Sequence, residues 1–324
     1  MIKVGIVGYG NLGRGVCLAV DKAVDMECVG IFTRRAPDTI KPVIEVPVYS
    51  VKELVKFKGQ IDVLLVCGGS ATDLPNTTPE LLKDFNTVDS FDTHAKIPAY
   101  YETLEKVAKE HGTLGAISIG WDPGLFSIAR MLFGAVLPDG NDYTFWGKGV
   151  SQGHSDAIRR IEGVKNAIQY TIPIDSALDR VRKGENPTLA TREKHLRECF
   201  VVVNEGADKS AIEKQIKEMP NYFKDYETIV HFVSEQELKE NHSRLSHGGF
   251  VLRSGNTAKD NSHLLELSLK LDSNPEFTGS VLTAYARAIA RLSKQGQSGV
   301  VTVFDIPIKY LSPMSEEELR ATLL

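Results

Sequence analysis

The stretch Ile2-Lys3-Val4-Gly5-Ile6-Val7-Gly8-Tyr9-Gly10-Asn11-Leu12-Gly13 decides the fold of this chain. A short apolar run, typical of a buried parallel strand, leads into the spacing Gly8-x-Gly10-x-x-Gly13, and a helical pattern follows over 12–24. Gly8 permits a tight turn, Gly10 lets a phosphate approach the backbone, and Gly13 lets the helix pack closely on the strand. The helix N-terminus favours anions. This order predicts a dinucleotide-binding domain; the alternative is a merely glycine-rich turn.

The second predicted strand, over 27–32, indicates which dinucleotide binds. Sites for NAD usually place an acidic residue at the end of this strand, where it binds the ribose hydroxyls. Here the strand ends in Thr33-Arg34-Arg35, without an acid. Guanidinium groups bind phosphate oxygens in a bidentate manner. The sequence therefore predicts NADP rather than NAD, unless the arginines are only a solvated basic pair on a loop.

Length and composition exclude several classes of protein. The 324 residues suffice for two domains, and the formal net charge of −4 gives no electrostatic footprint for nucleic acid or an anionic membrane. The four cysteines form no CxxC pair and fit a reducing cytoplasm, and no cluster has metal-ligand spacing. The first strand begins at once, so we expect no signal peptide. The longest apolar stretch, 124–137, is too short to span a bilayer and is expected to be a core-facing helix.

The order of predicted elements indicates two domains. Over 1–120, strands at 2–7, 27–32, 61–66, 86–89 and 114–119 alternate with helices at 12–24, 51–57, 79–85 and 97–111, which predicts an α/β, doubly wound parallel sheet of Rossmann type. From 121 to 294, longer strands are expected at 142–146, 166–173, 197–204, 227–233, 250–254 and 263–271, with helices at 125–137, 175–182, 209–219 and 277–294. They predict a second α+β domain with a mixed sheet. The segment of about 295–324 is expected to return to the first domain.

Polar residues follow several strands of the first domain, at the sheet edge where ligands bind in open α/β folds. They lie in Cys67-Gly68-Gly69-Ser70, Ser90-Phe91-Asp92 and Gly120-Trp121-Asp122-Pro123-Gly124. Asp92 or Asp122 could bind a substrate ammonium group or take a proton from it. An Asx turn or a helix cap is the alternative role.

The second domain offers candidates with an alternative for each. The loop Trp146-Gly147-x-Gly149-x-Ser151-Gln152-Gly153 could bring backbone N–H groups to a carboxylate, or Ser151 or Ser155 could cap the next helix. His247 could contact a ligand or be exposed, and Arg197 could bind a carboxylate or lie on the surface. These residues predict an NADP-dependent oxidoreductase of a small polar substrate. The alternatives are a non-catalytic NADP-binding sensor or scaffold, and a reductase of the dihydrodipicolinate-reductase or homoserine-dehydrogenase kind.

Longer blocks carry a resemblance to a known family. Along essentially its whole length the chain resembles the meso-diaminopimelate dehydrogenases, with no departure at the positions that matter. The matching blocks are Gly8-Tyr9-Gly10-Asn11-Leu12-Gly13, Phe32-Thr33-Arg34-Arg35, Gly69-Ser70-Ala71-Thr72-Asp73, Gly120-Trp121-Asp122-Pro123-Gly124, Trp146-Gly147, Ser151-Gln152-Gly153-His154-Ser155-Asp156, Met219-Pro220-x-Tyr222-Phe223, His247-Gly248-Gly249, Leu271-Asp272-x-Asn274-Pro275 and Gln295-Gly296-Gln297-Ser298-Gly299.

The resemblance implies an activity. It is the reversible NADP-dependent oxidative deamination of meso-2,6-diaminopimelate at its D-configured centre, which yields L-2-amino-6-oxopimelate, ammonia and NADPH for lysine and peptidoglycan precursor synthesis. It also implies a homodimer whose second domain carries the dimer contacts and much of the substrate site. A broader D-amino acid dehydrogenase on the same scaffold is the alternative.

The resemblance also implies the site residues. Cofactor contacts would come from Gly8, Tyr9, Gly10, Asn11, Leu12, Thr33, Arg34, Arg35, Cys67, Gly68, Gly69, Ser70, Ser90, Phe91, Asp92, Gly120, Trp121, Asp122, Pro123 and Gly124. Substrate contacts would come from Asp92, Asp122, Trp146, Gln152, Gly153, Thr171, Arg197, His247 and Asn274. Asp92 and Asp122 are the candidate catalytic residues, because a carboxylate can hold the ammonium groups and accept a proton. No metal is expected.

Overall fold

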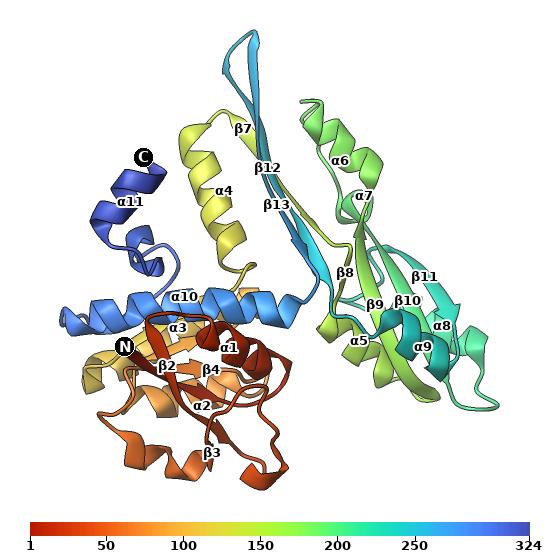
Figure 1. Cartoon of the computed structure of the whole chain (residues 1–324). Coiled ribbons are helices and arrows are strands. Elements are labelled where there is room, and N and C mark those ends of the chain that lie inside the picture. Colours follow the sequence, from red (N-terminus) through yellow and green to blue (C-terminus); the bar gives the residue numbers. More distant parts are fainter. The chain divides into compact units, whose positions relative to one another are not determined.

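The computed structural model describes all residues from 1 to 324, and the chain divides into two compact units (Figure 1). Unit 1 comprises residues 1–128 and 275–324, and unit 2 comprises residues 129–274. The sequence pattern places the boundaries at 120 and 294 instead. The difference arises mainly from helix α10 (Asn274–Lys294), whose apolar residues from Val281 to Leu292 share a hydrophobic cluster with Val4 and Ile6 of the first strand.

Unit 1 contains a seven-stranded sheet in which all neighbouring strands are parallel. The strand order β14-β6-β5-β4-β1-β2-β3 contains the doubly wound order of dinucleotide-binding sheets, which confirms the predicted fold class. Strand β14 pairs with β6, so the C-terminal segment joins this sheet. The strands are β1 (Ile2–Val7), β2 (Met26–Thr33), β3 (Val48–Ser50), β4 (Val63–Val66), β5 (Thr87–Asp89), β6 (Leu114–Ala116) and β14 (Gly299–Val301).

Helices cover both faces of this sheet. Val63 and Leu65 of β4 pack in one cluster with α1 (Asn11–Asp21) and α10, whereas Leu64 and Val66 pack in the other with α2 (Leu74–Leu82) and α3 (Ile97–His111). Burial on both faces explains why this strand is a continuous apolar run. The remaining elements of unit 1 are η1 (Pro37–Thr39), η2 (Val51–Phe57), η3 (His94–Lys96), η4 (Ile308–Leu311) and α11 (Glu316–Leu323).

Three local predictions in unit 1 need correction. The helix expected over 51–57 is a 3₁₀ helix, closed at its start by a capping box between Ser50 and Glu53. The helix expected from Pro79 begins at Leu74 and has Pro75 in its first turn, where proline is also tolerated. Strand β6 ends at Ala116 because Ser118 adopts a φ of 58°, which takes the chain out of the ladder.

Unit 2 contains two sheets. In the four-stranded sheet β11-β10-β9-β8, β10 pairs with β11 in parallel and with β9 in antiparallel orientation, which confirms the predicted mixed sheet. The other sheet, β13-β12-β7, is antiparallel, and β12 and β13 form a long hairpin (Figure 1). The strands are β7 (Gly140–Trp146), β8 (Gly149–Val150), β9 (Val164–Pro173), β10 (His195–Val203), β11 (Glu227–Phe232), β12 (His247–Ala258) and β13 (Asn261–Leu271).

Helices also pack on the sheets of unit 2. Ile158 of α5 (Gln152–Arg159) and Ile216 of α8 (Lys209–Glu218) pack in one cluster with Cys199 and Val201 of β10. Residues of α6 (Asp175–Arg182) pack on the antiparallel sheet. The short helices α7 (Thr191–Lys194) and α9 (Glu235–His242) complete the unit.

Helix α4 (Leu125–Val136) crosses the boundary between the units and differs from its prediction. Met131, Leu132 and Val136 are exposed, although the apolar pattern predicts a core-facing helix. No helix of the structure is both long enough and apolar enough to cross a membrane.

Candidate active site

The turn after β1 has the geometry that the glycine spacing predicts. Gly8 adopts a φ of +92°, which glycine allows, and its N–H donates to the carbonyl oxygen of Phe32 on β2 at 2.8 Å. A Cβ on Gly13 would lie 2.3 Å from the carbonyl oxygen of Gly8, so only glycine lets α1 pack this closely. A Cβ on Gly10 would meet no protein atom within 4 Å. Packing therefore does not require glycine at Gly10, and the N-terminus of α1 is open to a phosphate group.

Two arginines lie at the end of β2. The Arg35 guanidinium donates to the carbonyl oxygen of Tyr9, and its backbone N–H donates to the hydroxyl of buried Thr33 at 3.1 Å. The exposed Arg34 forms an ion pair with Asp73 at 2.9 Å. The Arg35 guanidinium therefore lies at the glycine turn, and Arg34 lies beside the loop that carries Asp73.

The carboxylate of Asp73 links the arginines to the loop after β4. It accepts a hydrogen bond from the N–H of Gly69 at 3.0 Å as well as the ion pair from Arg34. These two contacts, the Gly69 N–H first, hold the pKa of Asp73 below its usual range. The candidate cofactor loop from Cys67 to Ser70 is thereby attached to the end of β2.

The loops after β4 and β5 are also hydrogen-bonded to each other. The hydroxyl of Ser70 accepts from the backbone N–H of Asp92 at 2.8 Å and lies 3.2 Å from the hydroxyl of Thr93. Asp92 itself is exposed. Its carboxylate is therefore at the carboxyl edge of the sheet and accessible to a ligand.

Asp89 is a buried carboxyl that the sequence reasoning missed. Its Oδ1 accepts from the N–H groups of Phe91 and Ser118 at 3.1 and 3.4 Å, and its Oδ2 accepts from the hydroxyls of Tyr100 and Thr78 at 2.6 and 3.1 Å. Burial nevertheless raises its pKa. Asp89 joins the loop that carries Asp92 to the loop that follows β6. An acidic residue at the end of a predicted buried strand is the feature of the sequence that could have identified Asp89.

The loop after β6 places the second candidate acid. Trp121 is buried and packs edge-on against Phe126, with ring centroids 5.2 Å apart. Gly124 has a φ of +133°, and a Cβ there would lie 1.7 Å from the carbonyl oxygen of Gly120. Between them Asp122 is half-buried. Asp92 and Asp122 therefore both follow strands that end at the carboxyl edge of unit 1, as expected.

The electrostatic centre of unit 2 is Arg197. It lies on β10 opposite Thr171 of β9, both side chains are buried, and the guanidinium donates to the Thr171 hydroxyl. Its Cζ atom lies 3.9 Å from the ring centroid of Tyr226. No carboxylate compensates its charge, and burial lowers its pKa. A buried, unpaired cation is unfavourable by itself and can bind an anion strongly.

His247 lies close to Thr171, the neighbour of Arg197, because its ring packs on Gly149 of β8. Gly149 lies opposite Thr171, and a Cβ on it would lie 2.3 Å from Cγ of His247, so the histidine ring packs directly on this glycine. A Cβ on Gly147 would lie 2.0 Å from the carbonyl oxygen of Thr171. The structure therefore brings these three candidate carboxylate ligands together. From the sequence, Arg197 and His247 could each have been a surface residue without a ligand. Arg197 is buried, which excludes this alternative for Arg197.

His195 fixes Trp146 and was missed by the sequence reasoning. Its Nε2 accepts from the backbone N–H of Trp146 at 2.8 Å, and the two rings stack with centroids 5.3 Å apart. Burial and the nearby Arg197 lower the pKa of His195 to about 3, so the ring is neutral and can accept. His195 and Arg197 are two residues apart on a strand and share a face. This spacing of two residues on a strand is the feature of the sequence that could have linked His195 to Arg197.

The start of α5 carries the remaining polar candidates. Gln152 and Gly153 are exposed and are the first residues of α5, where N–H groups lack partners within the helix. Ser151 occupies the cap position, but its hydroxyl lies 2.7 Å from Nδ1 of His154 and caps no backbone N–H. Burial lowers the pKa of His154 to about 4.

At the end of unit 2, the Asn274 N–H donates to the carbonyl oxygen of Leu245 at 2.8 Å.

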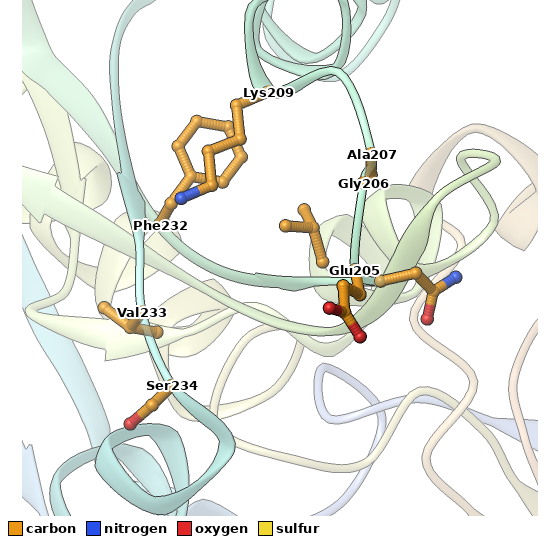
Figure 2. A pocket seen from close by; sticks show the side chains of 9 residues that line it. Glu205, Gly206, Ala207, Lys209, Phe232, Val233 and Ser234 are labelled. Atoms are coloured by element: carbon orange, nitrogen blue, oxygen red, sulfur yellow. The ribbon is translucent and has the colours of Figure 1, made fainter.

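An open pocket of about 490 Å³ lies at the carboxyl ends of β10 and β11 (Figure 2). Glu205, Lys209, Phe232 and Ser234 are among the residues that line it. None of the candidate site residues is among them, and Arg197 lies near the opposite end of β10. We assign no role to this pocket.

A doubly wound sheet with an open glycine turn, and a second unit with a buried, unpaired guanidinium, define the class of protein: a dinucleotide-binding protein whose second unit offers an anion site. Residues 120–273 match the family model of the diaminopimelic acid dehydrogenase C-terminal domain. The curated meso-diaminopimelate D-dehydrogenase of Ureibacillus thermosphaericus is 60% identical, over 100% of this chain and 99% of its own. The chain belongs to the meso-diaminopimelate D-dehydrogenase family, which makes it an amino acid dehydrogenase and not a sensor or scaffold.

Solved structures agree with this membership. A variant of meso-diaminopimelate dehydrogenase from Clostridium tetani E88, with six substitutions and in complex with DAP, is 53% identical and has a TM-score of 0.96 over 100% of both chains. An engineered D-amino acid dehydrogenase bound to NADP⁺ is 42% identical, with a TM-score of 0.88 over 100% of this chain and 99% of its own.

Proposed function

We propose that this chain catalyses the reversible oxidative deamination of meso-2,6-diaminopimelate at its D-configured centre, with NADP as the oxidant. The products are L-2-amino-6-oxopimelate, ammonia and NADPH. The observation that carries the proposal is the buried Arg197 without a counter-ion, next to Thr171 and His247. Such a group requires an anionic ligand, and each amino-acid head of diaminopimelate has a carboxylate.

The choice of NADP rests on the end of β2. Arg34 and Arg35 offer two guanidinium groups there, and no acid stands where NAD enzymes bind the ribose hydroxyls. The engineered relative bound to NADP⁺ supports the same choice. We assign the cofactor contacts to the loops at the carboxyl ends of β1, β2, β4, β5 and β6.

The substrate contacts in unit 2 have independent support. In the Clostridium tetani variant the substituted residues are a Gln, a Thr, an Arg, a Pro, a His and an Asn. These positions follow one another at the same intervals as Gln152, Thr171, Arg197, Ser246, His247 and Asn274 in this chain. Five of them, Gln152, Thr171, Arg197, His247 and Asn274, keep the relative's residue type, and we assign binding of the distal, L-configured head to these five together with Trp146 and Gly153.

The acids of unit 1 would handle the proton. Oxidation removes the Cα hydrogen of the D-centre as hydride, which NADP accepts when bound, and one proton from the ammonium nitrogen. Water then adds to the substrate iminium, and ammonia leaves. We propose that Asp92 or Asp122 accepts the proton from the ammonium group or from the water, because both carboxylates lie at the carboxyl edge of the sheet.

Selectivity for the meso isomer would follow from holding the distal head. A substrate fixed at one end by Arg197 presents one face of its D-centre, and such orientation contributes several kcal/mol to a barrier. Loss of Arg197 should therefore weaken the discrimination between isomers as well as binding.

We also propose that the enzyme is a cytoplasmic homodimer. Its four cysteines are free, as expected for a reducing compartment. The exposed apolar residues Met131, Leu132 and Val136 of α4 are the contacts with a second copy that we propose. Light scattering coupled to size-exclusion chromatography would contradict the dimer if it gave the monomer mass.

The test of the proposed function is an absorbance assay of NADPH formation at mildly alkaline pH. Purified protein receives NADP with meso-diaminopimelate, with the L,L isomer or with a simple D-amino acid, and NAD replaces NADP in a parallel series. We expect turnover only with the meso isomer and NADP. Turnover with simple D-amino acids would indicate the broader dehydrogenase, equal use of NAD would refute the role of the arginines, and no turnover would refute the proposal.

A further inference from the structure

Three buried polar side chains on one face of the mixed sheet have atoms without a hydrogen-bond partner in the protein. They are both amide atoms of Gln169, Nε of Arg197 and Oγ1 of Thr228. The large majority of buried polar groups in folded proteins have a partner, and leaving one without costs stability. Their concentration at one place therefore points to a ligand that is not part of the chain.

Strand register places these side chains around the guanidinium. Arg197 on β10 lies opposite Thr228 on β11. Gln169 on β9 lies opposite Cys199, two residues beyond Arg197, so that it points to the same face and is its diagonal neighbour. Diagonal neighbours are within reach of long side chains. Gln169 is fully buried and Thr228 nearly so.

The unpartnered atoms are also complementary in chemistry. The Nε–H of Arg197 can only donate, whereas the Gln169 amide offers an accepting oxygen and a donating NH₂ group, and the Thr228 hydroxyl can do either. One terminal nitrogen of the guanidinium is already occupied by the Thr171 hydroxyl, and its face is against Tyr226. Nε is thus the one buried nitrogen of Arg197 that no protein atom satisfies.

We propose that Gln169 and Thr228 are positioning residues for Arg197. Together they hold a water molecule that accepts the Nε–H, and this orients the guanidinium so that its terminal N–H groups bind the distal carboxylate of the substrate. The proposal rests on the proposed function, which assigns Arg197 to that carboxylate. In this arrangement the buried amide of Gln169, which would otherwise be unfavourable, becomes part of a preorganised anion site.

The test uses two substitutions that remove the polar groups at similar volume, Gln169→Leu and Thr228→Val. Loss of one hydrogen bond to a charged group should raise KM for meso-diaminopimelate roughly tenfold. We expect kcat and KM for NADP to stay at the wild-type values. We also expect Tm to fall slightly, because the buried Nε–H of Arg197 loses the water molecule that accepts it. A merely structural role would lower Tm in the same way but leave KM for meso-diaminopimelate unchanged, so KM decides between the two.

Two further variants serve as controls. Thr87 of unit 1 also has a buried hydroxyl without a partner, so Thr87→Val matches Thr228→Val and should not change KM for meso-diaminopimelate. Thr228→Ser keeps the hydroxyl and should keep the wild-type KM. The proposal is overturned if Gln169→Leu and Thr228→Val bind substrate as the wild type does, or if Thr87→Val or Thr228→Ser raises KM equally. If the wild type itself does not turn over meso-diaminopimelate, the proposed function fails first, and this proposal with it.

Discussion

The substitution Gly10→Ala separates the requirement of the fold from the requirement of the cofactor. Gly10 precedes α1 with φ −95° and ψ −156°, an extended conformation that alanine adopts readily, and the new methyl group would meet no protein atom within 4 Å. We therefore expect the free energy of unfolding to change by less than about 1 kcal/mol, the scale of a residue change at a helix N-cap.

Cofactor binding should respond quite differently. The methyl group would stand beside the N-terminal N–H groups of α1, where the fingerprint places the pyrophosphate. Loss of one charge-assisted hydrogen bond costs about 1.5–3 kcal/mol, which corresponds to a Kd for NADPH that is roughly 10- to 100-fold higher. Calorimetric titration with NADPH measures this Kd, and thermal unfolding followed by circular dichroism measures the stability.

Gly13→Ala is the matched control in the same turn. Its Cβ would lie 2.3 Å from the carbonyl oxygen of Gly8, so the backbone must shift, at a cost of about 1–3 kcal/mol in stability. Wild-type NADPH affinity in Gly10→Ala would refute the phosphate-approach argument. Equal instability of the two variants would refute the packing argument.

Three other predictions concern titratable groups. Whichever of Asp92→Asn and Asp122→Asn removes the proton acceptor should lower kcat about 10²- to 10⁴-fold without changing Kd for NADP; normal turnover in both would exclude the two acids. The pKa values of His195 and His154 are low in the folded chain, so between about pH 4 and pH 6.5 only the unfolded chain protonates these two rings. The free energy of unfolding should therefore be at its full value above about pH 6.5 and fall as the pH drops toward 4. The fall is up to about 1.4 kcal/mol per pH unit for each histidine. His195→Phe should make this fall shallower in urea unfolding series, and an unchanged slope would contradict the assignment. Asp89→Ala leaves four donors without their acceptor and should cost at least about 2 kcal/mol in the same unfolding assay, whereas an unchanged midpoint would show that the loops do not depend on it.

The predictions that the structure confirms rest on local patterns. The buried strand, the three glycines and the following helix are consecutive in the chain, so their spacing alone requires the turn that is observed at Gly8 and Gly13. The continuous apolar run of β4 likewise shows a strand covered on both faces before any contact is known. The start of α2 was predicted less accurately. The prediction began the helix at Pro79, whereas it begins at Leu74 with Pro75 in its first turn. Both prolines satisfy the rule that proline is tolerated in the first turn of a helix.

The dinucleotide-binding sheet, the basic end of β2 and the family were all predictable from the amino-acid sequence, because each depends on residues close together in the chain or on long matching blocks. The burial of Arg197 without a counter-ion, the packing of His247 on Gly149 beside Thr171 and the support of Trp146 by His195 become visible only in the folded chain. These contacts come from the pairing of β8, β9 and β10 and, for His247, from the start of β12. An exposed arginine and a buried, unpaired one have the same local sequence signal, and only the register of distant strands distinguishes them.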